Sequence, residues 1–276
     1  MEQVLKTMLE NMRAKSPLVH NITNYVTVND VANVLLAAGG SPIMSDDADD
    51  VEDITSICGG LNINIGTLNK NTIPSMFLAG KKANALGHIV LLDPVGAGAS
   101  RLRTDTANRL MQEVRFDAVR GNISEIKTLC TGSGSTKGVD ADAVDAVTEA
   151  NLDDGVQLVK AFAQKTGCIV AVTGAIDLVS DGERCWCIRN GRAEMSRITG
   201  TGCQLSALMT AFLVANPDRK LDAAAAAVCM MGLAGEIGWA NMQPGDGNST
   251  YRNRIIDAIF NMTGDALEEG AKYELR

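Results

Sequence analysis

Short apolar runs recur along the chain, separated by longer stretches with helical spacing. Their length and residue types are typical of strands. Two of them, Ile89–Asp93 and Ile169–Thr173, are almost continuously apolar, as expected for strands buried on both faces of a sheet. Residues 176–180 and 184–189, separated by Asp181-Gly182, predict a hairpin. The further strand candidates are 61–65 and the shorter 117–120.

Helical spacing fills the intervals between these runs. Residues 27–38 place Val31, Val34 and Leu35 on one stripe, and Gly39-Gly40 follows as a typical helix stop. Helices are also predicted at 71–86, 105–114, 122–130, 154–166, 203–215, 221–239 and 251–262. Strands that alternate with helices predict an α/β fold with a mostly parallel central sheet and helices on both faces. Ligands in such folds bind beyond the carboxyl ends of the strands.

The chain of 276 residues contains no linker or repeat, so we expect one domain over 1–276, although this length also allows two domains of about 150 residues. A net charge of −8 argues against binding to a nucleic acid, but not against a local basic pocket for a small phosphate. The Ala-rich stretch 223–235 is shorter than the ~20 residues of a membrane span. The N-terminus is rich in charge and lacks the apolar segment of a signal peptide. We therefore expect a cytoplasmic protein without a membrane partner.

Seven scattered cysteines form no Cys-x-x-Cys pair, and the two histidines lie far from them in sequence. This pattern argues against a disulfide framework or a structural zinc site. We expect reduced thiols that act as small core residues.

The most informative junction is 198–203, with the sequence ITGTGC, directly before an apolar helix. Glycine allows a close approach to a ligand, and the first amides of a helix are free to bind an anion such as a phosphoryl group. A plain glycine-rich turn between helix and sheet explains the pattern equally well. Cys203 stands at the helix start, where the dipole lowers a thiol pKa. The sequence is equally compatible with a reactive thiol and with a small packing residue.

A second junction follows the strand Ile89–Asp93, which ends in an acid and continues as Pro-Val-Gly-Ala-Gly. Asp93 is placed to face a ligand or magnesium, although Asp before Pro is also a common turn starter.

The segment from Arg120 to Glu125 reads Arg-Gly-Asn-Ile-Ser-Glu. Asn122 and Glu125 have the spacing of a helix capping box. In an equally weighted interpretation, Glu125 holds magnesium through water and Arg120 contacts a nucleotide phosphate. The hydroxyl of Thr173, at the end of another predicted strand, is a weaker phosphate candidate.

Three further features carry little functional weight. The segment 132–137 has glycines and a lysine but not the order of a P-loop, so we expect an exposed loop. His20 lies at a predicted strand end, where it could help to shape a pocket, but no neighbour in sequence makes it a base. Acids are favourable in the first turn of a helix, so a solvated face explains the acidic cluster better than a metal site. This cluster comprises Asp46, Asp47, Asp49, Asp50, Glu52 and Asp53.

Five blocks of the sequence, in this order, resemble the hydroxyethylthiazole kinase family of the ribokinase-like superfamily. They are PLVHNITNYVTVNDVANVLLAAGGSPIMSDD, LDPVGAGASRLR, VRGNISEI, VAVTG and TGTGCQLSA. The resemblance covers residues 4 to 274 approximately, and the first block is long and distinctive. It implies a ribokinase-like fold, ATP- and Mg²⁺-dependent phosphorylation of 4-methyl-5-(2-hydroxyethyl)thiazole, a role in thiamine salvage, and a homotrimer with active sites near the subunit interfaces.

The resemblance also implies roles for individual residues. Met44, Gly200 and Asn24 would contact the substrate, and Arg120 and Thr173 would bind ATP. The magnesium and phosphate end would lie at Asp93 and Glu125. Cys203 occupies the place of the base in the sugar kinases of the superfamily, where this family usually carries cysteine. Its role as a thiolate base or as a packing thiol stays open.

Three alternatives remain beside this interpretation. Another ribokinase-like kinase would act on hydroxymethylpyrimidine or a sugar, although cysteine in place of aspartate argues against a sugar. A hydrolase with a cysteine nucleophile would need a histidine partner, which the sequence does not place nearby. A non-catalytic metabolite-binding protein would have no use for the acids and the glycine turn.

Overall fold

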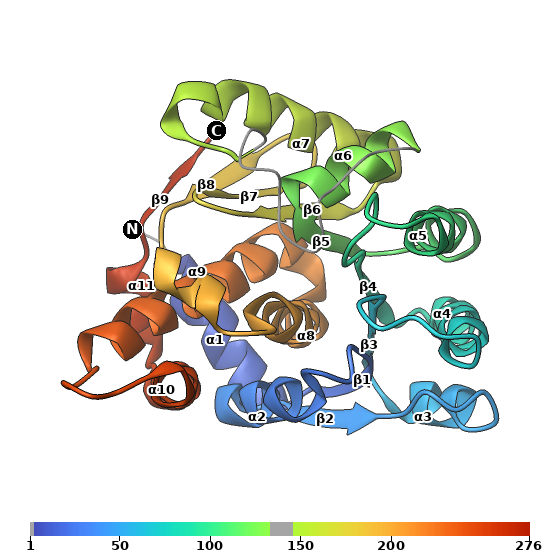
Figure 1. The fold of residues 1–276 in the computed structure, drawn as a ribbon, viewed down its shortest axis with the longest axis horizontal. Helices are drawn as coiled ribbons and strands as arrows, with labels where there is room; N and C mark the ends of the chain where they lie inside the picture. Colours follow the sequence, from blue (N-terminus) through green and yellow to red (C-terminus); the bar gives the residue numbers. More distant parts are fainter. Residues whose placement is uncertain (1–2, 133–145) are drawn as a thin grey trace.

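A nine-stranded sheet runs through the protein in this computed structural model, which describes residues 3–132 and 146–276 (Figure 1). The strand order is β2-β1-β3-β4-β5-β6-β7-β8-β9. Neighbouring strands from β2 to β6 pair in parallel, and those from β6 to β9 pair antiparallel. The strands are β1 Leu18–Ile22, β2 Ser41–Met44, β3 Gly60–Asn64, β4 Ile89–Asp93, β5 Ala118–Asn122, β6 Ile169–Thr173, β7 Asp177–Ser180, β8 Cys185–Ile188 and β9 Tyr273–Leu275.

Helices cover both faces of this sheet, as the alternating pattern predicts. One face packs against α3 Val51–Ile57, α4 Thr72–Leu86, α5 Arg101–Glu113, α6 Ile123–Thr131 and α7 Leu152–Thr166. The other face packs against α1 Val4–Lys15, α2 Val28–Ala38, α8 Thr201–Ala215, α9 Lys220–Ala240, α10 Asn248–Asn261 and α11 Gly264–Gly270. Each face therefore has its own hydrophobic core, and the sheet separates the two.

The predicted strands β4 and β6 have the observed bounds, and the hairpin forms as β7 and β8. The predicted helices are present with ends that differ by a few residues, the largest shift being the start of α5 at Arg101. Helices α1, α3 and α11 and the edge strands β2 and β9 were not predicted from the sequence. Residues 133–145, which include most of the predicted loop 132–137, lie outside the described residues.

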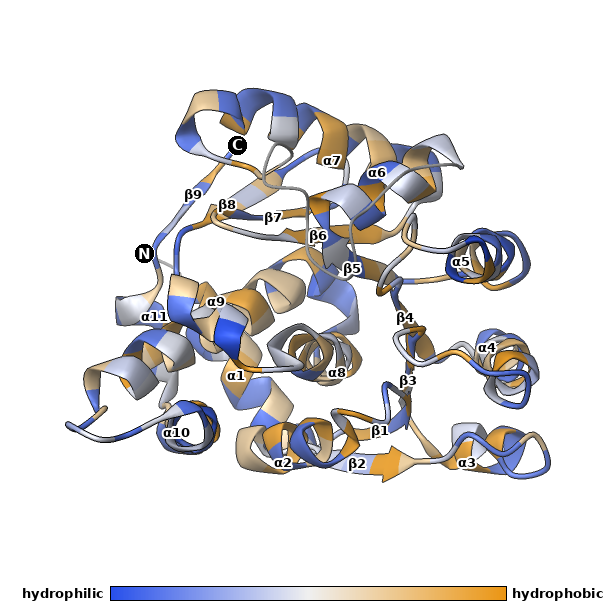
Figure 2. Ribbon diagram, viewed as in Figure 1, coloured by the Kyte–Doolittle hydropathy of each residue, from blue (hydrophilic) through white to orange (hydrophobic). Residues whose placement is uncertain are grey.

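The Ala-rich stretch 223–235 lies within the longer apolar helix α9, so the expectation that it is too short to span a membrane is wrong on length. Within the part of the chain that the structure describes, one helical segment, Pro217–Ala240, is long and apolar enough to cross a membrane. However, 78% of its most apolar window is buried inside the protein. Figure 2 shows the apolar character of the neighbouring α8, whereas the surface helix α5 is largely hydrophilic. The burial of α9 is that of a core helix, which explains why its sequence is apolar all round.

Candidate functional site

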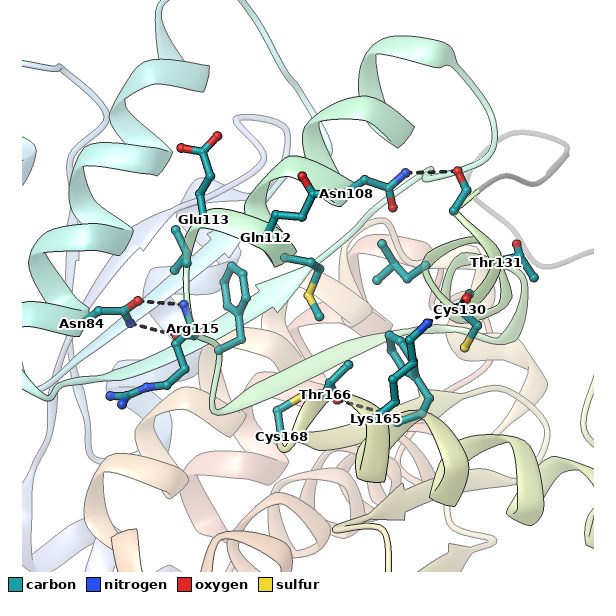
Figure 3. Close-up of a pocket in the computed structure, with 16 residues that line it drawn as sticks. Asn84, Asn108, Gln112, Glu113, Arg115, Cys130, Thr131, Lys165, Thr166 and Cys168 are labelled. Carbon is teal, nitrogen blue, oxygen red and sulfur yellow. Dashed lines mark hydrogen bonds between the residues drawn. The ribbon is translucent and has the colours of Figure 1, made fainter.

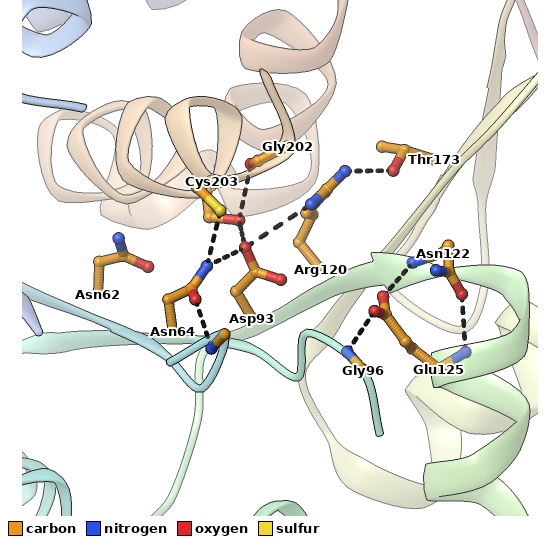
Figure 4. Close-up of polar contacts among 12 residues, drawn as sticks. Asn62, Asn64, Asp93, Gly96, Arg120, Asn122, Glu125, Thr173, Gly202 and Cys203 are labelled. Atoms are coloured by element: carbon orange, nitrogen blue, oxygen red, sulfur yellow. Dashed lines mark hydrogen bonds and ion pairs between the residues drawn. The ribbon is translucent and has the colours of Figure 1, made fainter. Parts of the chain in front are cut away.

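The carboxyl ends of the parallel strands and the start of α8 meet at one edge of the sheet. Several residues singled out from the sequence lie on these segments (Figure 4). They are Asn24 after β1, Met44 at the end of β2, Asp93 at the end of β4, Arg120 in β5, Thr173 at the end of β6, and Gly200 and Cys203 at the start of α8. Glu125 lies close by in the first turn of α6.

Helix α8 begins with a glycine that no other residue could replace without strain. Gly200 has φ +81°, and a Cβ at this position would lie 2.2 Å from Cγ2 of Thr27. The amide of Gln204 donates the first hydrogen bond of the helix, to the carbonyl of Gly200. The amides of residues 201–203 therefore precede the helix's own hydrogen bonds and point out at the positive end of its dipole. This arrangement suits an anion such as a phosphoryl group.

Arg120 adds a positive charge to the same helix end. A Cβ at Gly202 would lie 2.5 Å from an Arg120 guanidinium nitrogen, so this glycine leaves the space that the guanidinium fills. A second guanidinium nitrogen of Arg120 donates to Oγ1 of Thr173 at 2.5 Å. The two predicted nucleotide-binding residues thus lie in direct contact. Because the Thr173 hydroxyl accepts from Arg120, its own hydrogen is available for a phosphate oxygen.

Asp93 is fully buried, and its two carboxylate oxygens have different surroundings. Oδ2 accepts hydrogen bonds from Asn64 Nδ2 at 2.7 Å and Ser206 Oγ at 2.8 Å. The guanidinium of Arg120 lies 3.7 Å from the same oxygen. Oδ1 has no hydrogen-bond partner among the described residues. Burial raises the pKa of Asp93, while the charge of Arg120 and the two hydrogen bonds oppose that rise.

Asn64 and Ser206 belong to the candidate site, although no sequence motif predicted them there. Asn64 Oδ1 accepts from the amide of Gly66 at 2.9 Å, so the side chain is fixed on both sides. Its Nδ2 also lies 3.3 Å from the sulfur of Cys203. The available signal was the pair of asparagines in Leu-Asn-Ile-Asn-Ile, a strand in which both asparagines are buried. Buried amides need partners, which places such residues beside other polar groups.

The capping box predicted for α6 is present, and Glu125 does more than cap. Oε2 of Glu125 accepts from the amide of Asn122 at 2.8 Å, and Oε1 accepts from the amide of Gly96 at 2.7 Å. The carboxyl group thus ties the loop after β4 to the junction between β5 and α6. Burial, followed by the nearby charge of Asp93, raises the pKa of Glu125 to about 7.

Cys203 is buried, and burial together with the charge of Asp93 raises its pKa to about 11. At neutral pH the thiol form therefore dominates. This finding disfavours both the thiolate base and the cysteine nucleophile. Both ring nitrogens of His20 are occupied by Thr55 and Ser45, so His20 is not a partner for such a nucleophile either.

Met44 and Asn24 lie near the carboxyl ends of β2 and β1. Met44 is half-buried and packs against the core on the face that α2 and α8 cover. The amide nitrogen of Asn24 occupies the space beside Gly66, since a Cβ at Gly66 would lie 2.6 Å from it. Asn24 also accepts from the amide of Val26 at 3.0 Å. The side chain of Asn24 thus reaches from the loop after β1 to the loop after β3.

Other features of the molecule lie apart from this edge. The acidic cluster at 46–53 is exposed, and the described residues contain no group of three or more His, Cys, Asp or Glu side chains suited to a metal ion. His20 lies in the middle of β1 rather than at its end. An open pocket of about 1030 Å³ is lined by residues around the amino ends of β5 and β6, including Phe116 and Cys168 (Figure 3). None of the predicted site residues lines it.

Comparison with known proteins gives a consistent answer over the length of the chain. The sequence model of the hydroxyethylthiazole kinase family matches residues 9–265. The chain belongs to this family. A hydroxyethylthiazole kinase from Clostridium acetobutylicum is 57% identical over 271 residues, which are 98% of this chain and 99% of that protein. One from Clostridium beijerinckii is 49% identical over 269 residues, which cover 97% and 96% of the two chains.

Solved structures agree with this membership of the hydroxyethylthiazole kinase family. The structure of a hydroxyethylthiazole kinase from Pyrococcus horikoshii OT3 superposes with a TM-score of 0.87 at 32% identity, covering 99% of this chain and 98% of that one. A pyridoxal kinase from Staphylococcus aureus, solved with AMP-PCP, reaches a TM-score of 0.64 at 14% identity over 94% and 97% of the chains. That more distant likeness shows the fold alone, which confirms the ribokinase-like fold. The family membership confirms a kinase.

The raised pKa of Glu125 gives a specific pH dependence of stability. A carboxyl whose pKa rises from 4.5 in the unfolded chain to about 7 in the folded chain stabilises the native state below pH 4.5, and this contribution is lost as the pH rises towards 7. Glu125→Gln cannot ionise. Its free energy of unfolding, relative to the original protein, should therefore improve by up to about 3 kcal/mol between pH 5 and pH 8.

Urea unfolding at both pH values, in buffer without divalent metal, measures this difference. The amide nitrogen of glutamine cannot accept the hydrogen bond that Glu125 accepts, but this cost is the same at every pH. A difference between variant and original protein that does not change with pH would contradict the assignment.

Proposed function

We propose that the protein transfers the γ-phosphoryl group of ATP to the hydroxyl of 4-methyl-5-(2-hydroxyethyl)thiazole, with Mg²⁺, giving the thiazole phosphate used in thiamine salvage. The observation that carries this proposal is the meeting of the α8 amides, Arg120 and the buried carboxyl of Asp93 at one edge of the sheet. A site with two positive features and one buried acid suits a transferring phosphoryl group better than a neutral ligand.

The carboxyl groups of Asp93 and Glu125 suit a magnesium ion. Oδ1 of Asp93 is buried and has no partner among the described residues, although a buried carboxylate oxygen normally accepts a hydrogen bond. Each oxygen of Glu125 accepts one amide and retains a further lone pair, which suits contact through water. Mg²⁺ held by these two carboxyls would neutralise charge on the β- and γ-phosphates of ATP.

The remaining chemistry belongs to side chains and amides of this chain. The substrate hydroxyl oxygen forms a bond to the γ-phosphorus, the bond from that phosphorus to the β–γ bridging oxygen breaks, ADP leaves, and the hydroxyl proton is released. Amides of residues 201–203 hold the oxygens of the transferring group. Arg120 and Thr173 hold the nucleotide phosphates. Cys203 stays a thiol and packs beside the reacting hydroxyl, since this reaction demands little of a base.

The acceptor would lie between β2 and the start of α8. Met44 offers a flexible thioether to the thiazole ring, a favourable pairing of sulfur with an aromatic face. Asn24 would line the same pocket, and the backbone of Gly200 would approach the hydroxyl because it carries no side chain.

We further propose one kinase domain over residues 1–276, a cytoplasmic location and a homotrimer whose active sites lie near the subunit interfaces. The continuous sheet supports the single domain. Helix α1 contributes Leu5 and Leu9 to the core. Tyr25 and Val26, directly after Asn24, are 74% and 57% exposed. Exposed apolar side chains beside a site are typical of an interface.

The first test measures ATP consumption with magnesium and one of four acceptors: hydroxyethylthiazole, hydroxymethylpyrimidine, ribose or none. We expect turnover with the thiazole alcohol alone, because the chain belongs to the hydroxyethylthiazole kinase family. Turnover with another acceptor would change the assigned substrate but would still support the phosphoryl-transfer site. Thiazole binding without turnover would favour a non-catalytic binding protein.

A pair of variants separates the roles of the helix start. Cys203→Ala should keep roughly a tenth or more of the activity, because a thiol that only packs contributes little to the transition state. Gly200→Val should lower kcat by a factor on the order of 10² to 10³, because the side chain meets Thr27 and displaces the amides from the phosphoryl group.

Steady-state kinetics on both purified variants, with circular dichroism to establish folding, makes the comparison. Equal losses in two folded variants would contradict the assignment of Cys203 as a packing thiol.

The assembly is tested by light scattering at micromolar concentration. We expect three times the chain mass of 29.1 kDa. Tyr25→Lys should shift the protein towards a smaller species, because a charge at an apolar interface is costly to bury. Phe260→Lys, at a residue that is 66% exposed on α10, is the matched control and should keep the mass unchanged. A monomeric original protein would remove the interface from the proposal.

A further inference from the structure

His20 connects three elements next to Met44, the proposed acceptor contact, through its two ring nitrogens. It lies in the middle of β1 and is fully buried. Nε2 lies 2.9 Å from the carbonyl oxygen of Ser45, the residue directly after Met44. Nδ1 lies 3.0 Å from Oγ1 of Thr55, which belongs to α3. One side chain therefore links β1, the end of β2 and α3.

The chemistry of the partners determines which ring nitrogen carries the hydrogen. A carbonyl oxygen can only accept, so Nε2 carries the hydrogen and donates to Ser45. Nδ1 is then the acceptor, and the hydroxyl of Thr55 donates to it. Burial lowers the pKa of His20, which agrees with a neutral ring at neutral pH. The Thr55 contact thus fixes the tautomer that holds Ser45.

The end of β2 needs such an anchor because β2 is the first strand of the sheet and pairs on one side only. Its partner is β1, and the pairing ends with Asn21 opposite Met44. All four residues of β2 are half-exposed. The side chain of Met44 packs on the α2/α8 face, whereas His20 is held from the α3 face. His20 therefore holds the backbone from the side opposite to the pocket, where it does not compete with a ligand.

We infer that His20 is a positioning residue for the acceptor: its hydrogen bond to the Ser45 carbonyl fixes the backbone next to Met44 and so sets where the Met44 thioether meets the substrate ring. This inference rests on the proposed function, because it needs Met44 to contact the thiazole. His20 touches neither substrate nor nucleotide in this assignment. Its effect should therefore fall on acceptor binding and leave the phosphoryl-transfer step unchanged.

Steady-state kinetics on His20→Leu and His20→Gln tests the inference. Leucine fills a similar volume without a donor, and we expect it to raise KM for hydroxyethylthiazole about five- to tenfold. KM for ATP and kcat should stay within about twofold, a split that general loss of structure does not produce. Glutamine can donate an amide hydrogen over a comparable reach and should recover most of the acceptor affinity. His88→Leu, before the amino end of β4, is the matched control and should leave both KM values unchanged.

A double variant tests whether the effect passes through Met44. In a Met44→Ala background, His20→Leu should raise KM for the acceptor no further, because the side chain that it positions is absent. An additive increase would overturn the inference, and so would an unchanged acceptor KM in folded His20→Leu or an equal rise in both KM values. If His20→Leu does not fold, Thr55→Val removes only the hydroxyl that fixes the tautomer. It should raise the acceptor KM about two- to threefold, and no change would overturn the inference.

The original protein, assayed in parallel, separates this inference from the function on which it rests. Turnover of the thiazole by the original protein, with no shift in the variants, overturns the role of His20 alone. No turnover by the original protein removes the proposed function and this inference together.

Discussion

A carboxylate in a protein interior is tolerable only with partners that compensate for lost water, and Asp93 places this constraint at the centre of the site. Arg120 supplies the opposite charge, and Asn64 and Ser206 supply hydrogen bonds to one oxygen. Since these partners come from β3, β5 and α8, the requirement to stabilise one acid holds three elements together. The hydrogen bonds to Oδ2 also fix the orientation of the carboxyl group. Oδ1, which has no partner among the described residues, is then the oxygen available to a ligand.

The two glycines of α8 let backbone amides and a guanidinium share a small volume. Gly200 fits against Thr27, and Gly202 leaves the space that Arg120 fills. Larger residues would separate the helix start from the sheet and weaken the field that both positive groups create. Catalysis by phosphoryl transfer relies on such fixed charges more than on a base. The raised pKa of Cys203 agrees with a reaction that needs no base, because the neutral thiol adds no charge beside Asp93.

Much of the fold follows from the sequence, because β4 and β6 are buried on both faces and their continuous apolar runs admit few other structures. Edge strand β2 has only four half-exposed residues, so no apolar pattern marks it. Asp93, Arg120 and Gly200 could be predicted at one sheet edge, because each lies at a junction between a predicted strand and a helix or at a helix start. Ser206 could not be predicted as their neighbour, since 113 residues separate it from Asp93 and only the packing of α8 on the sheet brings them together. Local spacing likewise gave the capping role of Glu125 but not its bond to Gly96.

The order of helices along the chain has a consequence for biosynthesis. The helices on one face, α3 to α7, lie between the parallel strands in sequence, so this half of the protein can assemble while the ribosome is still at work. The other face waits for α8, α9, α10 and α11, which follow all the parallel strands. Helix α1 leaves the ribosome first, yet it packs on α8, α9 and α11, and its Lys6 pairs with Asp265 at 2.7 Å. The nascent chain therefore carries a sheet face that lacks most of its covering helices until α8 to α11 emerge, and chaperones bind exposed apolar surface of this kind.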